Sequence, residues 1–343
     1  MSKRVFLAFA FFTVLNAISF SEENLNQKSL SHAQVAATAF VPYGITLAGI
    51  GTRFLFPENL RGYSMTAFST VANIPSCIID PFYSIPMTAA GSGMMLSSNI
   101  WVNDFGEYSF GRKNLSSIGH FGMDMNMYTA YHGYAVARKM GPSELYQNKE
   151  NYSFSELMLS PFNPGVLKEA YVCAPILGYA AVLLLSNSMN GFENSIFNSG
   201  HGYFGDRKVN ALAGFFGLLA YSLVDFTITG VGEESFFRGT GYEEMQVSFG
   251  LLPAKIMDCV CFAGAHVPQD IFYENENAGE VVSGFASRAL MGLILQAVYD
   301  KCGLRASTAV HMWVDTLITM FQYMYSCGVE NDYKFSIDFK IKL

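Results

Sequence analysis

Charged residues are scarce in this sequence. Of its 343 residues, 14% are Asp, Glu, Lys or Arg, whereas 51% are hydrophobic, and the mean hydropathy is +0.23. Soluble globular domains carry about 25% charged residues. This deficit excludes a disordered chain and a coiled coil, and it disfavours an ordinary soluble enzyme. The composition fits best a polytopic membrane protein whose helices are joined by sizeable polar connections.

Basic residues and cysteines are also few. The 21 Lys and Arg residues are outnumbered by 28 Asp and Glu residues, so the net charge is −7 and the pI is about 5.4. Nucleic-acid binding needs a basic surface, so nucleic acid is excluded as a partner. The six cysteines are too sparse for a disulfide scaffold, and no two of them have the CxxC spacing of zinc or thioredoxin sites.

The first residues have the order of a secretory signal peptide. Lys3 and Arg4 precede an apolar run over residues 5–15, and small residues follow up to Ser21. Eleven apolar residues are too few to cross the ~30 Å of hydrocarbon in a bilayer. We therefore expect residues 1–21 to be a signal peptide or, if they are not cleaved, an N-terminal anchor. Either one directs the chain to a membrane.

Apolar segments continue along the chain and strengthen in its second half. Residues 33–50 and 80–100 are weak candidate spans because glycine and proline interrupt them. Residues 139–168 are a polar connection. Stronger apolar segments follow at residues 170–189, 209–229, 230–245, 251–265, 281–298 and 304–324. The tail, residues 335–343, alternates apolar and polar side chains, which is typical of a short strand.

These segments predict an all-α protein, a polytopic transmembrane helical bundle. We divide the chain into four regions: the signal peptide or anchor at 1–21, an N-terminal extension of membrane-associated helices at 22–168, a membrane-embedded core at 169–325 and a polar tail at 326–343. The extension contains no chemistry that can be assigned from its sequence.

Ionisable residues inside apolar segments are costly to bury, so they are candidates for a functional site. In residues 230–245, Glu234 and Arg238 are four residues apart with the acid first, which is the favourable order for an ion pair on one helix face. Glu233 is about 100° further around the helix. It would be left without that cation, free to face a cavity and to act as a base on water.

Two later apolar segments each contain a histidine. His266 follows Phe262 by four residues, and Asp315 follows His311 by four, so that the acid could orient the imidazole. Two histidines and a glutamate that converge in a membrane cavity could activate water and stabilise an oxyanion, as amide hydrolysis requires. Asp225 lies alone in its segment, and we interpret it as a structural residue.

The two histidine patterns, taken alone, are weak evidence of a site. FxxxH and HxxxD are each expected about once by chance in a chain of this length. A lone histidine in an apolar run is usually a hydrogen-bonded core residue. Two histidines and a carboxylate are also a zinc ligand set, but no HExxH is present. We expect no cofactor, and zinc is the less favoured alternative. The order of the patterns in successive apolar segments favours a shared site.

The sequences EESFFR, FAGAH and HMWVD resemble, in this order, the three motifs of the CPBP intramembrane proteases, EExxxR, FxxxH and HxxxN or D. This family includes CAAX prenyl endopeptidases and bacteriocin-processing and immunity proteins. The resemblance covers about residues 170–325. It implies an all-helical membrane core, with the motifs lining a cavity within the bilayer, and a metal-independent, glutamic mechanism.

The resemblance also implies a role for each motif residue. Glu233 and His266 match the pair that activates water, and Glu234 and Arg238 match the second glutamate and the arginine of the first motif. His311 and Asp315 match the residues that support the oxyanion. Many members have Asn at the position of Asp315. Because an ionised Asp cannot donate a hydrogen bond, Asp315 must be protonated or must instead orient His311.

The expected function is therefore that of an intramembrane endopeptidase that cleaves a membrane-associated peptide or protein. The signal-peptide-like start indicates a bacterial chain, so we expect an integral protein of the inner membrane, in contact with lipid. Two alternatives remain. The chain could be a catalytically idle binding or immunity-type protein with the same fold, or a zinc-dependent membrane hydrolase that uses the same residues.

Overall fold

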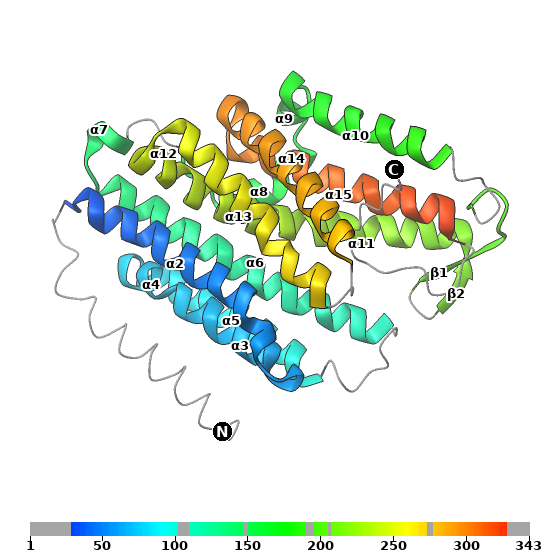
Figure 1. Cartoon of the computed structure of the whole chain (residues 1–343), viewed down its shortest axis with the longest axis horizontal. Helices are drawn as coiled ribbons and strands as arrows, with labels where there is room; N and C mark the ends of the chain where they lie inside the picture. The colour runs from blue at the N-terminus through cyan, green and yellow to red at the C-terminus, as the bar shows by residue number, and fades with distance from the viewer. Residues whose placement is uncertain are drawn as a thin grey trace.

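The computed structural model describes residues 29–101, 110–146, 150–188, 195–204, 207–272 and 277–327. The expected signal peptide at 1–21 and the alternating tail at 335–343 lie outside these residues. Within them the chain is almost entirely helical, with one two-stranded antiparallel sheet, so the predicted all-α class is confirmed (Figure 1).

The structure has these elements in chain order: α2 (His32–Thr52), η1 (Arg53–Leu55), α3 (Glu58–Ala72), α4 (Ile74–Ile79), α5 (Pro81–Trp101), α6 (Phe110–Lys139), α7 (Ser143–Tyr146), α8 (Phe154–Leu159), η3 (Ser160–Phe162), α9 (Pro164–Leu167), α10 (Ala170–Ser188), β1 (His201–Phe204), β2 (Arg207–Asn210), α11 (Ala211–Phe236), η4 (Phe237–Tyr242), α12 (Glu243–Phe249), α13 (Leu251–Phe272), α14 (Ala278–Cys302) and α15 (Leu304–Ser326). The described part of residues 139–168, which were predicted as a polar connection, thus contains the short helices α7, α8, η3 and α9.

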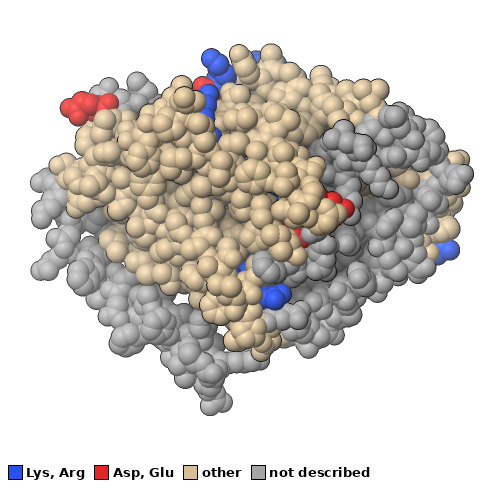
Figure 2. Space-filling model, in the orientation of Figure 1, with Lys and Arg blue, Asp and Glu red and all other residues tan. Residues whose placement is uncertain are grey.

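Three described helical segments are long and apolar enough to cross a membrane. They are His32–Leu55, Ala211–Phe249 and Ala278–Cys302, and a shorter apolar helix covers Ala170–Leu185. Large apolar side chains on these segments are exposed, such as Leu185, Leu212 and Val282, which are 70%, 58% and 67% exposed. Uncharged side chains predominate on the face in Figure 2. Such surfaces suit lipid contact, and the chain is an integral membrane protein.

The segments predicted at 209–229 and 230–245 are one continuous helical run rather than two. α11 continues through η4, a six-residue π-helical segment, into α12. π-Helical turns are rare in proteins, and those that occur often lie at functional sites. Side chains of α2 and α6 pack closely on this segment: a Cβ on Gly241 would lie 2.2 Å from the Tyr43 ring, and one on Gly239 would lie 2.7 Å from the Tyr131 ring. Glycine is therefore required at both positions.

The helices of the N-terminal extension pack directly against those of the core. Figure 1 shows α2 to α6, in blue and cyan, beside the later helices, and α6 packs along α11. At this interface Tyr128 and Tyr131 form a hydrophobic cluster with Val231. Arg138 of α6 forms a buried ion pair with Glu243 of α12. The division at residue 168 stays a prediction, but the described parts on its two sides share one core.

Candidate active site

The first motif lies at the end of α11 and in η4, and it forms the ion pair expected from its spacing. Arg238 Nη1 lies 3.1 Å from Glu234 Oε1, and both side chains are completely buried. The guanidinium carbon also lies 4.3 Å from the centre of the Phe262 ring, within the range of a cation–π interaction. Arg238 therefore connects α11 to α13, which contains the second motif.

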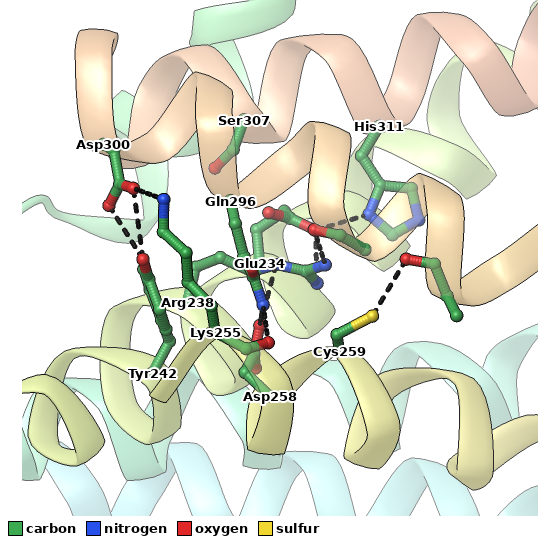
Figure 3. Close-up of polar contacts among 12 residues, drawn as sticks. Glu234, Arg238, Tyr242, Lys255, Asp258, Cys259, Gln296, Asp300, Ser307 and His311 are labelled. Carbon is green, nitrogen blue, oxygen red and sulfur yellow. Dashed lines mark hydrogen bonds and ion pairs between the residues drawn. The ribbon is translucent and has the colours of Figure 1, made fainter. Parts of the chain in front are cut away.

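Glu234 makes a second contact that its position in the sequence does not reveal. The same oxygen, Oε1, lies 2.8 Å from Nδ1 of His311 on α15 (Figure 3). A carboxylate oxygen accepts, so Nδ1 carries the proton. The helical spacing predicts that Glu234 pairs with Arg238 and that Asp315 orients His311. In the structure Glu234 contacts both Arg238 and His311, and it holds the Nδ1 side of the ring.

The other nitrogen of His311 faces two acids. Nε2 lies 3.3 Å from Asp315 Oδ2 and 3.7 Å from Glu233 Oε2. Glu233, His311 and Asp315 are thus brought together from α11 and α15, although 78 positions separate the first two. Glu233 retains 16% side-chain exposure, compared with 0% for Glu234. Of the two neighbouring glutamates, Glu233 is the one that water can reach.

His266 is connected to His311 by contacts with Phe262. Its Nδ1 lies 2.9 Å from the backbone oxygen of Phe262, one helical turn earlier on α13. Because a carbonyl oxygen can only accept, Nδ1 is protonated, and in the neutral ring Nε2 keeps a free lone pair. The centre of the Phe262 ring lies 5.3 Å from that of His266 and 6.1 Å from that of His311, so Phe262 packs edge-on against both histidines. No hydrogen bond or ion pair joins His266 to Glu233 among the described residues.

An acid of the N-terminal extension, Asp124 on α6, also reaches this site. It is 2% exposed, and it accepts a 3.4 Å hydrogen bond from Thr229 of α11. Glu233 and Asp225 interact with it electrostatically. A Cβ on Gly232 would lie 2.5 Å from Asp124 Cβ, so the two helices are in close contact here. Asp124 is not among the residues predicted from the sequence, because it lies outside the apolar segments in which buried acids stand out.

Asp225, interpreted from sequence as structural, lies within α11 rather than at a helix end. A capping role is therefore excluded by its position. It interacts electrostatically with Asp124 and with Asp315. Within the described ranges, no three His, Cys, Asp or Glu side chains are grouped so as to hold a metal ion. The expected absence of a cofactor stays a prediction.

The fold and this buried group of acids, imidazoles and one arginine define a helical membrane protein with a polar site between α11, α13 and α15. Residues 215–317 match the family described as type II CAAX prenyl endopeptidase, Rce1-like. The matched segment contains all six predicted site residues and confirms the resemblance inferred from the three motifs. It supports a membrane protease that acts on a peptide or protein. No curated protein and no solved structure matches the chain.

Proposed function

We propose that this protein is an intramembrane endopeptidase that hydrolyses a peptide bond of a membrane-associated peptide or protein. The main support is the approach of Glu233, His311 and Asp315 to one another beside the buried Glu234–Arg238 ion pair. This arrangement lies within the segment that is similar to CAAX prenyl endopeptidases. Burying so many ionisable groups is costly and favours a catalytic role over a purely structural one.

In the proposed reaction, Glu233 removes a proton from a water molecule, and the lone pair of His266 Nε2 helps to orient that water. The water oxygen attacks the carbonyl carbon of the peptide bond and forms a tetrahedral oxyanion. Glu233 then gives its proton to the leaving nitrogen, and the C–N bond breaks. The exposed fraction of Glu233 supports its role as the base, since Glu234 has no exposed surface.

His311 is proposed to stabilise the oxyanion through Nε2–H. To donate from Nε2 while Nδ1–H is bound by Glu234, the ring must be an imidazolium, and Glu234 is its counter-ion. Asp315 lies on the same side and supports the oxyanion if it is protonated, or orients Nε2 if it is ionised. No metal ion takes part in this proposal, which makes the catalytic type glutamic.

We propose that the protein lies in a bacterial inner membrane, as we expect from its sequence. Prenylated substrates, to which the family description refers, are then not the expected substrates. A hydrophobic peptide or a membrane-anchored protein is expected instead.

The test compares new peptide termini in membranes that contain the wild-type protein, Glu233→Gln or Glu144→Gln at equal levels. Glu144 is an exposed acid on α7 and is a matched control for the substitution. Termini present with wild type and Glu144→Gln, but absent with Glu233→Gln, would support proteolysis and identify the substrate. If all three folded proteins yield identical termini, the binding or immunity-type function replaces the protease.

A further inference from the structure

Asp258 is a fully buried carboxylate that belongs to none of the three motifs. It lies on α13, four residues before Phe262 and eight before His266, so these three side chains share one face of the helix. A buried carboxylate requires a compensating charge or hydrogen bonds. The partners of Asp258 show what it does in the molecule.

The first partner is Arg238, whose guanidinium is held on several sides. Nε lies 3.6 Å from Asp258 Oδ2, on the α13 side. Nη1 binds Glu234, and Nη2 donates to the backbone oxygen of Gly292 on α14 at 3.3 Å. The positive charge of Arg238 is therefore shared by two buried carboxylates, Asp258 and Glu234, that approach it from different helices (Figure 3).

The second partner is Gln296 of α14, which is 1% exposed. Its Nε2 donates to Asp258 Oδ2 at 2.8 Å and to the backbone oxygen of Lys255 at 3.0 Å. These two bonds fix the carboxylate against α13 and present it to Arg238. Gly292 and Gln296 are four residues apart on one face of α14, so this helix contacts both members of the pair.

The charge of Arg238 affects His311 through a shared atom. Oε1 of Glu234 contacts both Arg238 Nη1 and His311 Nδ1. If Glu234 alone compensated Arg238, less negative charge would remain on this oxygen for the imidazole. Asp258 supplies a second negative charge to the arginine, which strengthens Glu234 as the acceptor for His311.

We infer that Asp258, held in place by Gln296, is a positioning residue that shares the charge of Arg238 and thereby lets Glu234 orient His311. Its importance for catalysis rests on the proposed function. The charge-sharing itself does not, because it concerns contacts that exist without substrate.

The first test therefore needs no activity. Protein with ¹⁵N-labelled histidine is prepared as wild type, Asp258→Asn and Asp300→Asn, and His311 Nδ1 is assigned with His311→Asn. Asp300 lies on α14 and pairs with Lys255 at 2.9 Å rather than with Arg238, so it is a control aspartate outside the site. We expect Asp258→Asn to shift the Nδ1 resonance of His311 and Asp300→Asn to leave it in place. An unchanged resonance in Asp258→Asn overturns the inference.

A milder variant keeps the inference testable if Asp258→Asn does not fold. Gln296→Met is similar in size but cannot hydrogen-bond to Asp258, and it keeps the carboxylate. We expect a smaller shift of the same resonance in the same direction. Thermal unfolding of each variant shows whether it is folded. If Asp258→Asn does not fold, an unchanged His311 resonance in folded Gln296→Met overturns the inference.

The second test measures how fast the wild-type-specific termini appear. We expect Asp258→Asn to slow cleavage by roughly tenfold or more, as when a hydrogen bond to a charged group is weakened. In a Glu234→Gln background the same substitution should add little, because Glu234 transmits the effect. Equal losses in both backgrounds indicate a merely structural role and overturn the inference. If the wild-type protein produces no new termini, only the proposed function is overturned. The Nδ1 resonance of His311 still tests whether Asp258 shares the charge of Arg238.

Discussion

Glu234 and His311, 77 residues apart in the chain, are joined by a 2.8 Å contact between Oε1 and Nδ1. The same oxygen binds Arg238. Glu234 is therefore the residue of α11 that contacts both the arginine of η4 and the imidazole of α15. It sets which nitrogen of His311 faces Glu233 and Asp315. The two neighbouring glutamates have different surroundings, which leads to different expectations for their variants.

Glu234→Gln should destabilise the protein more than Glu233→Gln does. The change leaves Arg238 buried with Asp258 as its remaining carboxylate, at 3.6 Å. Removing one partner of a buried ion pair typically costs about 3–5 kcal/mol. Glu233 is partly exposed, and its cationic neighbour, His311 Nε2, lies 3.7 Å away, so its change should lower stability much less. Thermal unfolding of the two purified variants in one detergent checks this contrast, and equal unfolding temperatures would contradict it.

Asp315→Asn should keep cleavage within a few-fold of the wild-type rate, whereas Asp315→Ala should slow it by roughly 100-fold. An amide at this position can donate a hydrogen bond to the oxyanion and still contact His311 Nε2, from which Asp315 lies 3.3 Å away. Alanine can do neither. Initial rates of terminus formation in matched membranes measure both effects. If the Asn variant is as slow as the Ala variant, Asp315 acts as an ionised carboxylate rather than as a donor.

Gly232→Ala should lower both stability and cleavage. Its Cβ would lie 2.5 Å from Asp124 Cβ, so α6 and α11 must move apart next to Glu233. Overpacking of this kind typically costs about 1–3 kcal/mol. Gly217→Ala on the same helix is the matched control, because nothing lies within 4 Å of its Cβ. The unfolding temperatures and cleavage rates of the two variants should differ clearly. Equal behaviour would show that this helix contact has no bearing on the site.

Cleavage should persist after the protein is treated with a strong chelator and freed of metal. The proposed chemistry uses Glu233, His266 and His311 without a metal ion. The zinc alternative predicts about one tightly bound metal ion per chain and loss of activity on chelation. Elemental analysis of the purified protein, together with rates before and after chelation, distinguishes the two mechanisms. Activity that is lost with the metal and returns with added zinc would establish the zinc hydrolase.

Local spacing was enough to predict part of the site. Glu234 and Arg238 lie one turn apart on the same helix, and His311 and Asp315 do so on another, so helix geometry alone brings each pair together. Composition was enough to predict a membrane protein, because a chain with 14% charged residues leaves large apolar surfaces that lipid can cover. The three motifs further identified the family that residues 215–317 match.

Contacts between helices could not be predicted in this way. Asp124 meets Gly232 across more than 100 residues, and Gln296 meets Asp258 across 38. Neither Asp124 nor Gln296 lies in a motif, and in both cases the packing of two helices decides the contact.

The sequence by itself determined the helical membrane class, the motif residues and the contacts within one turn of a helix. Helical periodicity and the cost of burying charge act locally, so they can be evaluated from the order of residues. The tertiary structure decided that Glu234 rather than Asp315 holds Nδ1 of His311, and that Asp258 and Asp124 adjoin the site. These contacts depend on which helix faces meet, and close packing of many side chains distributed along the chain sets that choice.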